Sequence, residues 1–401
     1  MNSNVVITRR NVFQRLGDSI KGILVGLLLI AISFPVLFLN EGRAVKTAKS
    51  LQEGAAAVVS VSADIVDPAH EGALVHVIAT VEVDEALTDD IFGIMAHSAT
   101  GLKRTVEMFQ WREDSTTQTR TSVGGTEERV TTYSYRQEWS SNLIRSSSFN
   151  DPSHRNPTEM PYPEMTLHPS TAGFGAFQLT SAHLTRFTSF QPIHLTDEHL
   201  DALPASAGAG FRIHNGALFR GADPASPAVG DVRITFSQAP AGAATVVGRQ
   251  TGDSFTAYPT QAGRPLLFVR SGVAAADEVF SDAMAANTFL TWILRFVGGL
   301  LMFLGLTMVL KPLSVLASVL PMAGRIVATG TGIVAFIISA SVSLVVIAIA
   351  WIVYRPLFGI GLLVLAGGIA LGLKTVWKKA PGAAVPSPAP ASGGTEPPPP
   401  L

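Results

Sequence analysis

The sequence predicts an integral membrane protein of the α+β class, with four transmembrane helices and a large β-rich extracytoplasmic domain between the first and second. Three observations support this fold class. Apolar residues gather in four blocks, one near the N-terminus and three after Phe289. The charged fraction is only 15%, where about a quarter is usual for soluble proteins. The long segment between the first two blocks alternates apolar and polar residues, as half-buried strands do.

The first predicted transmembrane helix covers residues 22–39, which hold no charge. This is about the minimum length that crosses roughly 30 Å of hydrocarbon. The run is long for a signal-peptide core and no Ala-x-Ala site follows it closely, so it is interpreted as an uncleaved signal anchor. Residues 1–21 form a basic cytoplasmic N-terminus, which is either an amphipathic helix lying on the membrane or an ordinary charged flank.

Three further transmembrane helices are predicted near the C-terminus, over residues 289–310, 326–353 and 357–373. Arg295 falls inside the first of them and is interpreted as an interfacial arginine whose stem snorkels outward, with an intramembrane charge as the alternative. Pro356 disfavours helix at the residue before it, so the last two helices form a tight hairpin. The remaining segments are a cytoplasmic loop over residues 311–325 and a disordered, Pro-, Ala-, Gly- and Ser-rich cytoplasmic tail over residues 374–401.

Basic residues next to the spans predict the orientation. With four spans, both termini and the loop 311–325 share one side, which carries nine flanking Lys and Arg residues against four on the other side. The richer side is expected to be cytoplasmic. Residues 40–287 are then expected in a periplasm or an organelle lumen.

Within residues 40–287 the alternation predicts strands at 59–65, 75–83, 105–112, 129–139, 231–237, 244–249 and 265–270. Gly124 and Gly125 lie between two of these and suggest a hairpin tip over residues 118–127. Helical patterns are weaker and cover residues 197–203 and 275–286. Ala44, Ala48 and Leu51 fall on one helical face and predict a short amphipathic continuation of the first span, with Gly54 as a plausible stop. This segment therefore joins a membrane anchor to a β-rich domain.

The sequence predicts no catalytic, cofactor-binding or metal site. There are no cysteines, which excludes thiol catalysis and cysteine-based zinc sites, and the net charge of −1 argues against a nucleic-acid partner. His70 and His76 on one strand would lie about 20 Å apart, too far to share one ion. His194 and His199 do not have the spacing of a helical zinc motif. An enzyme would need polar residues gathered by the fold, such as Glu107, Arg112, Arg136 and Glu138.

Glycine pairs in two spans indicate close helix packing. Gly22 and Gly26 in the first span, and Gly368 and Gly372 in the fourth, are each four residues apart, a spacing that lets helix backbones approach closely. Chance is an alternative, because glycine is common in membrane helices. The pairs make the lipid bilayer and a second copy of the chain the expected partners.

Nine segments resemble, in order, the transmembrane protein 43 (LUMA) family. They are NEGRAVKTAKSLQEG, EGALVHVIATV, LKRTVEMFQW, YSYRQEWSS, HRNP, VGDVRITFS, VVGRQTGDSF, DEVF and WIVYRPL. The resemblance covers nearly the whole chain, and four spans with one large loop is that family's layout. The Pro-rich tail and the Gly- and Ala-rich residues 205–210 depart from it.

The resemblance implies a non-enzymatic membrane scaffold or organiser that needs no cofactor. Animal members are proteins of the endoplasmic reticulum and nuclear inner membrane, linked to lamins, emerin and nuclear-envelope organisation. If the chain is bacterial, those partners do not apply and a bacterial inner membrane is expected. A membrane-associated enzyme or transporter acting on lipid or envelope components is the alternative function, although a transporter should carry buried charges and broken helices near the bilayer midplane.

Overall fold

The computed structural model describes residues 4–122, 126–317 and 321–355. By its internal contacts the chain divides into two units, Met1–Ile347 and Ala348–Leu401. The fold and the sites described below belong to the first unit. The predicted fourth span, residues 357–373, and the predicted tail, residues 374–401, lie outside the described residues.

In the described part of the chain, three long helices are apolar enough to cross a membrane: α1 (Val12–Ala57), α4 (Ala276–Ala317) and α5 (Pro321–Tyr354). They contain the first three predicted spans, but each is longer than its span. α4 continues past Lys311 and Pro312 to Ala317, and α5 begins at Pro321, so the described residues of the predicted loop 311–325 are helical. A proline inside a membrane helix is tolerated where neighbouring groups satisfy the freed backbone. α5 ends at Tyr354, as the proline two residues later predicts.

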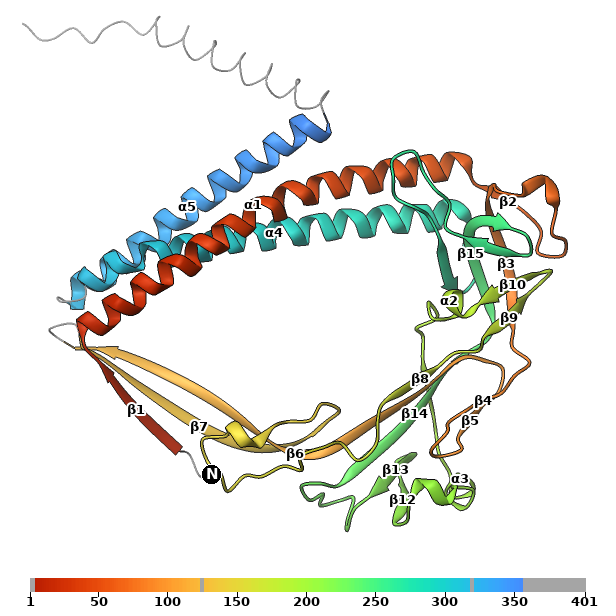
Figure 1. Cartoon of the computed structure of the whole chain (residues 1–401), viewed down its shortest axis with the longest axis horizontal. Helices are drawn as coiled ribbons and strands as arrows, with labels where there is room; N and C mark the ends of the chain where they lie inside the picture. Colours follow the sequence, from red (N-terminus) through yellow and green to blue (C-terminus); the bar gives the residue numbers. More distant parts are fainter. Residues whose placement is uncertain (1–3, 123–125, 318–320, 356–401) are drawn as a thin grey trace, which may run out of the picture. The chain divides into compact units, whose positions relative to one another are not determined.

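Helices α1 and α4 pack side by side (Figure 1). Small residues allow this contact: a Cβ built on Gly26 would stand 2.7 Å from the carbonyl oxygen of Gly305, and one on Gly298 would stand 2.6 Å from the Leu37 side chain. Such distances are shorter than atoms tolerate, so only glycine lets the two backbones come this close.

An eight-stranded sheet runs in the order β1-β7-β6-β14-β13-β12, with β11 beside β14 and β8 beside β6. Its strands are β1 (Asn4–Arg10), β6 (Ala99–Thr121), β7 (Glu127–Ser140), β8 (Met165–Leu167), β11 (Gln191–Ile193), β12 (Phe211–His214), β13 (Ala217–Arg220) and β14 (Val232–Pro240). The predicted hairpin therefore exists, and its two strands are longer than the patterns at 105–112 and 129–139 indicated.

A seven-stranded sheet runs in the order β10-β9-β3-β15-β16, with β17 beside β15 and β2 parallel to β3. Its strands are β2 (Val59–Ser60), β3 (Leu74–Glu82), β9 (Thr171–Phe174), β10 (Phe177–Thr180), β15 (Ala243–Thr251), β16 (Ser254–Thr256) and β17 (Phe268–Ser271). The smaller elements are β4 (Leu87–Thr88), β5 (Met95–Ala96), α2 (Ser181–Leu184), α3 (Asp197–Asp201) and the 3₁₀ turns Pro68–His70, Ser146–Ser148 and Ala205–Ala207.

The N-terminal segment differs from its predicted form. Residues 4–10 form strand β1, which pairs antiparallel with β7 over seven residues, from Asn4 opposite Tyr133 to Arg10 opposite Glu127. Val5, Val6, Ile7 and Thr8 are β-branched, a side-chain type that favours strands. The basic residues hid this preference in the sequence, and only the residues from Val12 onward are helical.

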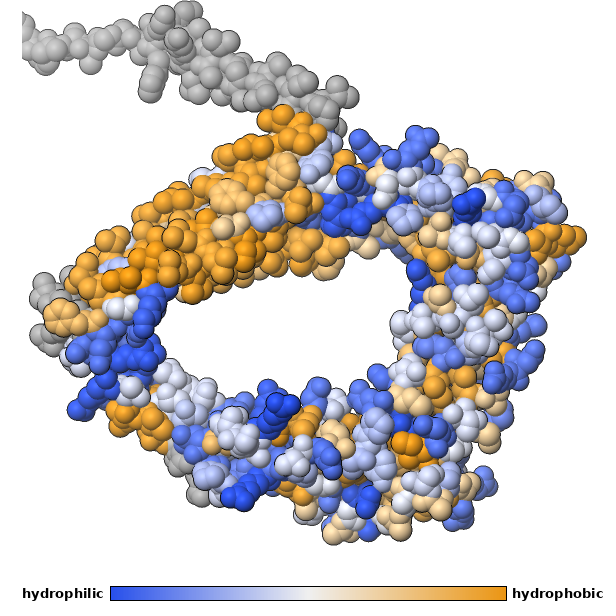
Figure 2. All heavy atoms as spheres, viewed as in Figure 1, coloured by the Kyte–Doolittle hydropathy of each residue, from blue (hydrophilic) through white to orange (hydrophobic). Residues whose placement is uncertain are grey.

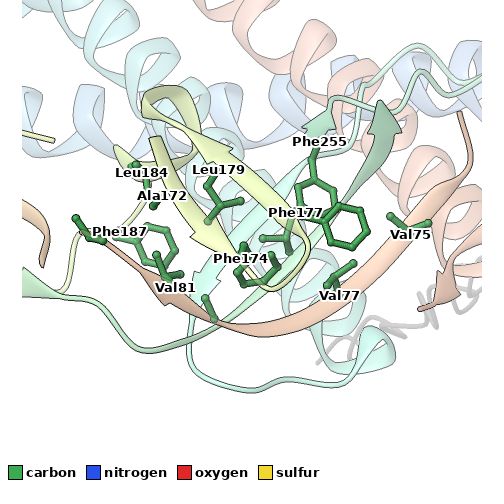
Figure 3. Packing of buried hydrophobic residues seen from close by; sticks show 13 residues of the cluster. Val75, Val77, Val81, Ala172, Phe174, Phe177, Leu179, Leu184, Phe187 and Phe255 are labelled. Atoms are coloured by element: carbon green, nitrogen blue, oxygen red, sulfur yellow. The ribbon is translucent and has the colours of Figure 1, made fainter. Parts of the chain in front are cut away.

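Three apolar clusters form the interior of the β-rich domain. Figure 3 shows the first, in which side chains of β3, β9 and β10 meet Phe255 of β16, whose ring stacks on that of Phe177 with centroids 4.9 Å apart. The second centres on Phe92, Val106 and Phe236. Full burial of each such side chain stabilises the fold by about 1.5–3 kcal/mol. The third cluster joins the domain to the helices, because Leu51 of α1 and Phe280 of α4 pack there against Leu74 of β3.

Large apolar side chains cover the outer surface of the long helices. Leu24, Phe289, Phe296 and Phe336 are each more than 60% exposed. On the face shown in Figure 2, hydrophobic residues gather over the helices and hydrophilic residues over the sheets. A continuous apolar surface of this kind is unstable in water, so these helices belong in lipid.

Candidate functional site at the junction of α1 and α4

A row of polar side chains interrupts the apolar contact between α1 and α4. On α4 the row is Asn287, Thr291 and Arg295, spaced four residues apart, which puts all three on one helical face. On α1 it is Asn40, Glu41 and Arg43. The row lies at the start of α4's apolar stretch and the end of α1's.

Glu41 and Arg295 form a bidentate ion pair at the centre of this row. The Arg295 Nε and Nη2 atoms donate to the two carboxylate oxygens of Glu41 at 2.6 and 2.9 Å. The Glu41 side chain is fully buried and that of Arg295 is 16% exposed. The guanidinium also lies 4.8 Å from the centre of the Trp292 ring, close enough for a cation–π contact.

Arg43 anchors the rest of the row. It donates to the side-chain oxygens of Asn287 at 2.9 Å, Thr291 at 2.9 Å and Asn40 at 3.1 Å. The Asn40 amide donates in turn to the carbonyl of Thr291 at 3.1 Å. The Asn287 amide donates to the carbonyl oxygen of Ala44 at 3.0 Å. Each helix therefore contacts the side chains and the backbone of the other.

This arrangement is suited to fixing the register of two helices and not to chemistry. Both oxygens of Glu41 accept from Arg295 and the side chain is fully buried, so the carboxylate is poorly placed to take a proton from a reacting group. Sliding α1 along α4 would leave a buried charge unpaired, which costs several kcal/mol.

The sequence-based interpretation of Arg295 was wrong, because its head group pairs with Glu41 instead of snorkelling to water. Glu41 itself was missed. Two signals could have found the pair: the four-residue spacing of Asn287, Thr291 and Arg295, and the single acidic residue directly after the first apolar run.

The structure places the candidate enzyme residues on the surface of the β6–β7 hairpin. Arg112 and Arg136 both pair with Glu138, at 2.9 and 3.1 Å. Hydrogen bonding to Arg112 holds the pKa of Glu138 below its usual value. Glu107 pairs instead with Arg233, at 2.7 Å. Arg112–Glu138 and Arg233–Glu107 are cross-strand pairs, which stabilise a sheet modestly, whereas Arg136 and Glu138 lie on the same strand. Glu107 and Arg233 line a pocket beside Trp139 that includes none of the other three candidates.

Tyr135 has the only large pKa shift resolved among the described residues. Its hydroxyl donates to Glu113 at 2.6 Å and accepts from the Asp151 backbone N–H at 2.9 Å. Burial, followed by the hydrogen bond to Glu113, raises the pKa of Tyr135 to about 12. The phenol therefore stays protonated at neutral pH and serves as a structural hydrogen-bond donor.

The histidines singled out in the sequence hold local structure. His76 lies between the Ser60 hydroxyl and the Ala274 carbonyl oxygen, at 3.0 and 2.9 Å, and His70 lies near Asp67. His199 accepts from the backbone N–H of Thr196 at the start of α3. In the described part of the chain no three His, Asp or Glu side chains are placed to hold a metal ion.

His183, which the sequence did not single out, is buried beneath β16. Its Nδ1 accepts from the Thr180 backbone N–H at 3.0 Å, and its Nε2 lies 2.9 Å from the Phe255 carbonyl oxygen. With Nε2 protonated, both ring nitrogens are satisfied in the neutral form. Burial lowers the pKa of His183.

Gly22 and Gly26, two of the helix-packing candidates, face α4 of the same chain. A Cβ on Gly22 would meet Met308 at 3.8 Å, which is ordinary contact, whereas Gly26 lies against the α4 backbone. Gly368 and Gly372 lie outside the described residues.

The model of the transmembrane protein 43 family matches residues 108–356. Transmembrane protein 43 of Rattus norvegicus is 35% identical over 361 residues, which cover 86% of this chain and 87% of the relative. The Homo sapiens protein of that name is 34% identical over 374 residues, covering 89% and 90%. The Drosophila melanogaster homolog is 33% identical over 356 residues, covering 86% and 91%. No solved structure matches the chain.

Nearly full-length identity of about a third, the family match and the apolar helices agree. The chain is a membrane protein and belongs to the transmembrane protein 43 family.

Proposed function

We propose that the chain is a non-enzymatic membrane scaffold, whose β-rich domain is held along one face of the bilayer and binds a protein or lipid partner there. One observation carries this proposal: the helix pair α1–α4 is fastened to the β-rich domain at both ends. A domain held at two ends presents a fixed surface, whereas a single tether would let it reorient.

The first fastening lies where α1 ends and α4 begins. Leu51 and Phe280 enter the third apolar cluster, and two arginine–carboxylate pairs from Arg270 reach Glu278 and Asp282 on α4 at 3.4 and 3.0 Å.

The second fastening lies at the other end of α1. Strand β1 extends the β6–β7 hairpin, and Arg15 of α1 forms an ion pair with Glu127 of β7 at 3.1 Å. Both side chains of this pair are less than 15% exposed, and Arg9 adds a pair with Glu128 at 3.0 Å. A two-stranded hairpin alone is marginal in water, so the third strand gives this part of the sheet its stability.

Strand pairing restricts how the protein sits in the membrane. Paired strands lie about 4.8 Å apart, so roughly 30 Å of hydrocarbon cannot separate residues 4–10 from residues 127–133. The hairpin tip, with Glu127, Glu128 and Arg129, is too polar to enter the lipid itself. We therefore propose that the N-terminal strand and the β-rich domain lie on the same side of the bilayer.

If the N-terminal strand and the β-rich domain share one side, residues 1–21 cannot be cytoplasmic while residues 40–287 are extracytoplasmic. In this arrangement, α1 and α4 are embedded from one face, and α5 with the predicted fourth span forms the hairpin that crosses the bilayer. Arg9, Arg10, Arg15 and Lys21 then lie on the domain's own side, and so does Lys311, because the end of α4 packs beside the start of α1. The charge count consequently no longer favours that placement.

Self-association belongs to the proposed function, with the predicted fourth span as its contact. Lamins and emerin are partners only if the chain functions in a cell with a nuclear envelope, where the endoplasmic reticulum and inner nuclear membrane are its expected sites. No observation in the described residues favours the alternative function, an enzyme or a transporter.

Cross-linking in intact membranes tests the scaffold function. Two differently tagged copies of the full chain are co-expressed, cross-linked and purified through one tag. A scaffold predicts recovery of the second tag and of a reproducible partner set that changes when residues 1–10 are deleted. A monomer with no reproducible partner at native expression, or a partner set indifferent to the deletion, would contradict the proposal.

A further inference from the structure

A cavity of about 660 Å³ opens where α1, α4 and the segment before β17 meet. Its walls include Leu51 of α1, Leu266 and Phe268 of the β-rich domain, and Val279 and Leu290 of α4. Leu290 is the second residue of α4's predicted span, so the cavity lies at the level where the helices enter lipid. Phe289 and Trp292, on the same part of α4, are 69% and 62% exposed, as residues at a membrane interface often are.

The polar part of the lining is strongly cationic. Four arginines line the cavity, namely Arg43, Arg186, Arg264 and Arg270, against a single carboxylate, Asp282. That carboxylate is already paired with Arg270 at 3.0 Å. The cavity therefore holds an excess of positive charge.

Three of these guanidinium groups have no carboxylate partner among the described residues. Arg43 donates only to neutral side chains, and its Nε is buried without a hydrogen-bond partner. Arg186 donates to the carbonyl oxygen of Leu267 at 2.9 Å. The Arg264 side chain has no ion pair within the described part of the chain. Uncompensated guanidinium groups around one cavity repel one another, and a bound anion would relieve that repulsion.

The ligand must match both halves of the cavity. Guanidinium groups match the geometry of a phosphate group, to which they can donate two hydrogen bonds each. The apolar walls would receive a hydrocarbon chain. An anionic phospholipid at the bilayer surface carries both parts and is present at high local concentration, and basic pockets at the ends of membrane helices bind such head groups.

We propose that this cavity binds one anionic phospholipid, with its phosphate against Arg43, Arg186 and Arg264 and an acyl chain along Leu290. The inference rests on the proposed function in one respect, that the β-rich domain binds at the membrane surface. It specifies the lipid partner and the residues that recognise it. A bound phospholipid would contact α1, α4 and the β-rich domain at the same time.

The test uses the purified full chain in a neutral detergent and measures the thermal unfolding midpoint. Phosphatidylglycerol is added in one arm, phosphatidylcholine in a second and inorganic phosphate in a third. The proposal predicts a rise in the midpoint with phosphatidylglycerol only, because ligands that bind the native state stabilise it. An equal rise with phosphatidylcholine, or a full rise with inorganic phosphate, would overturn it.

Matched variants distinguish binding in the cavity from nonspecific attraction of the lipid to positive charge elsewhere on the protein. Arg186→Gln with Arg264→Gln should weaken phosphatidylglycerol binding at least about tenfold, since each removes a charge-assisted hydrogen bond. Arg212→Gln, on the exposed surface of β12, should behave as the parent. The paired Arg→Lys changes should keep part of the affinity, because charge remains and only the bidentate geometry is lost. Unchanged affinity in the double Gln variant would refute the site.

A second measurement keeps the proposal testable if the double variant fails to fold. A photoreactive phosphatidylglycerol is cross-linked to the parent protein, and the labelled peptides are mapped. Labelling within residues 264–290 is expected, and labelling confined elsewhere would contradict the site. Neither assay depends on which side of the bilayer the domain occupies or on self-association, so failure here leaves the scaffold proposal standing.

Discussion

The buried pair of Glu41 and Arg295 gives the sharpest stability prediction. Arg295→Met removes the guanidinium and leaves a fully buried carboxylate without its bidentate partner. Breaking a buried pair from one side costs about 3–5 kcal/mol, because the remaining charge has lost its solvation and gained nothing. The single substitution should therefore destabilise the protein by about that amount.

The double variant Glu41→Gln with Arg295→Met should recover most of this loss. It replaces the ion pair with a neutral amide beside an apolar chain of similar length, and exchanges of whole buried pairs are often nearly neutral. The assay is reversible unfolding of the full chain in mixed micelles with increasing dodecyl sulfate, followed by tryptophan fluorescence and circular dichroism. Comparing the single and double variants therefore measures the stability that the ion pair contributes, and not the effect of removing the arginine alone.

Two results would refute this reasoning. If Arg295→Met unfolds at the same dodecyl sulfate fraction as the parent, Arg295 does not pair with Glu41 in the folded protein. If the double variant is as unstable as the single, the loss comes from the arginine's packing against Trp292 and not from an unpaired carboxylate.

Three further predictions concern packing, pH and assembly. Gly26→Leu should cost about 1–3 kcal/mol or more in the same unfolding assay, because even its Cβ would stand 2.7 Å from an α4 carbonyl oxygen; Gly330→Leu, which has open space around its Cα, is the control. The pKa of His183 is lower in the folded protein than in the unfolded chain, so the unfolded chain binds the proton more readily. The stability that neutral His183 contributes is therefore complete above about pH 6.5 and is lost as the pH falls through the folded pKa. The thermal midpoint of the parent should drop more between pH 7 and pH 5 than that of His183→Gln, and equal drops would contradict this. Gly368→Ile with Gly372→Ile should reduce cross-linking between tagged copies without preventing insertion, and undiminished cross-linking would move self-association elsewhere.

The apolar spans and the β-rich domain were predictable because both depend on local patterns. Residues 22–39 and 289–310 are apolar in any context, and the alternation at residues 75–83 is that of a strand with one buried face. Element boundaries were less accurate. Helix α1 continues to Ala57 because its last turns pack into the third apolar cluster through Leu51, a contact between distant segments.

Pairings between distant residues were not predictable from one sequence. The partner of Arg295 lies 254 positions away, and the partner strand of β1 begins beyond residue 126. The cavity arginines come from three separate stretches of chain, at Arg43, at Arg186 and at Arg264 with Arg270. Periodicity reports which face of an element is buried, but it does not report what covers that face.

The N-terminal strand and the β-rich domain are proposed to lie on one side of the membrane, which cross-linking can test directly. The chain has no cysteines, so introduced pairs can be cross-linked without background. Val6→Cys with Thr131→Cys tests the β1–β7 pairing, in which these residues are register partners. Thr117→Cys with Thr131→Cys is the matched control inside the hairpin, where the two hydroxyls are 3.0 Å apart.

The measurement is cross-linking of both pairs in intact membranes with a short bifunctional thiol reagent, read as an intramolecular shift in gel mobility. If β1 pairs with β7 in the membrane, both pairs cross-link to similar extents within one chain. Efficient cross-linking of the control with none for Val6→Cys and Thr131→Cys, together with labelling of Val6→Cys only from the opposite face, would contradict the pairing and the shared side.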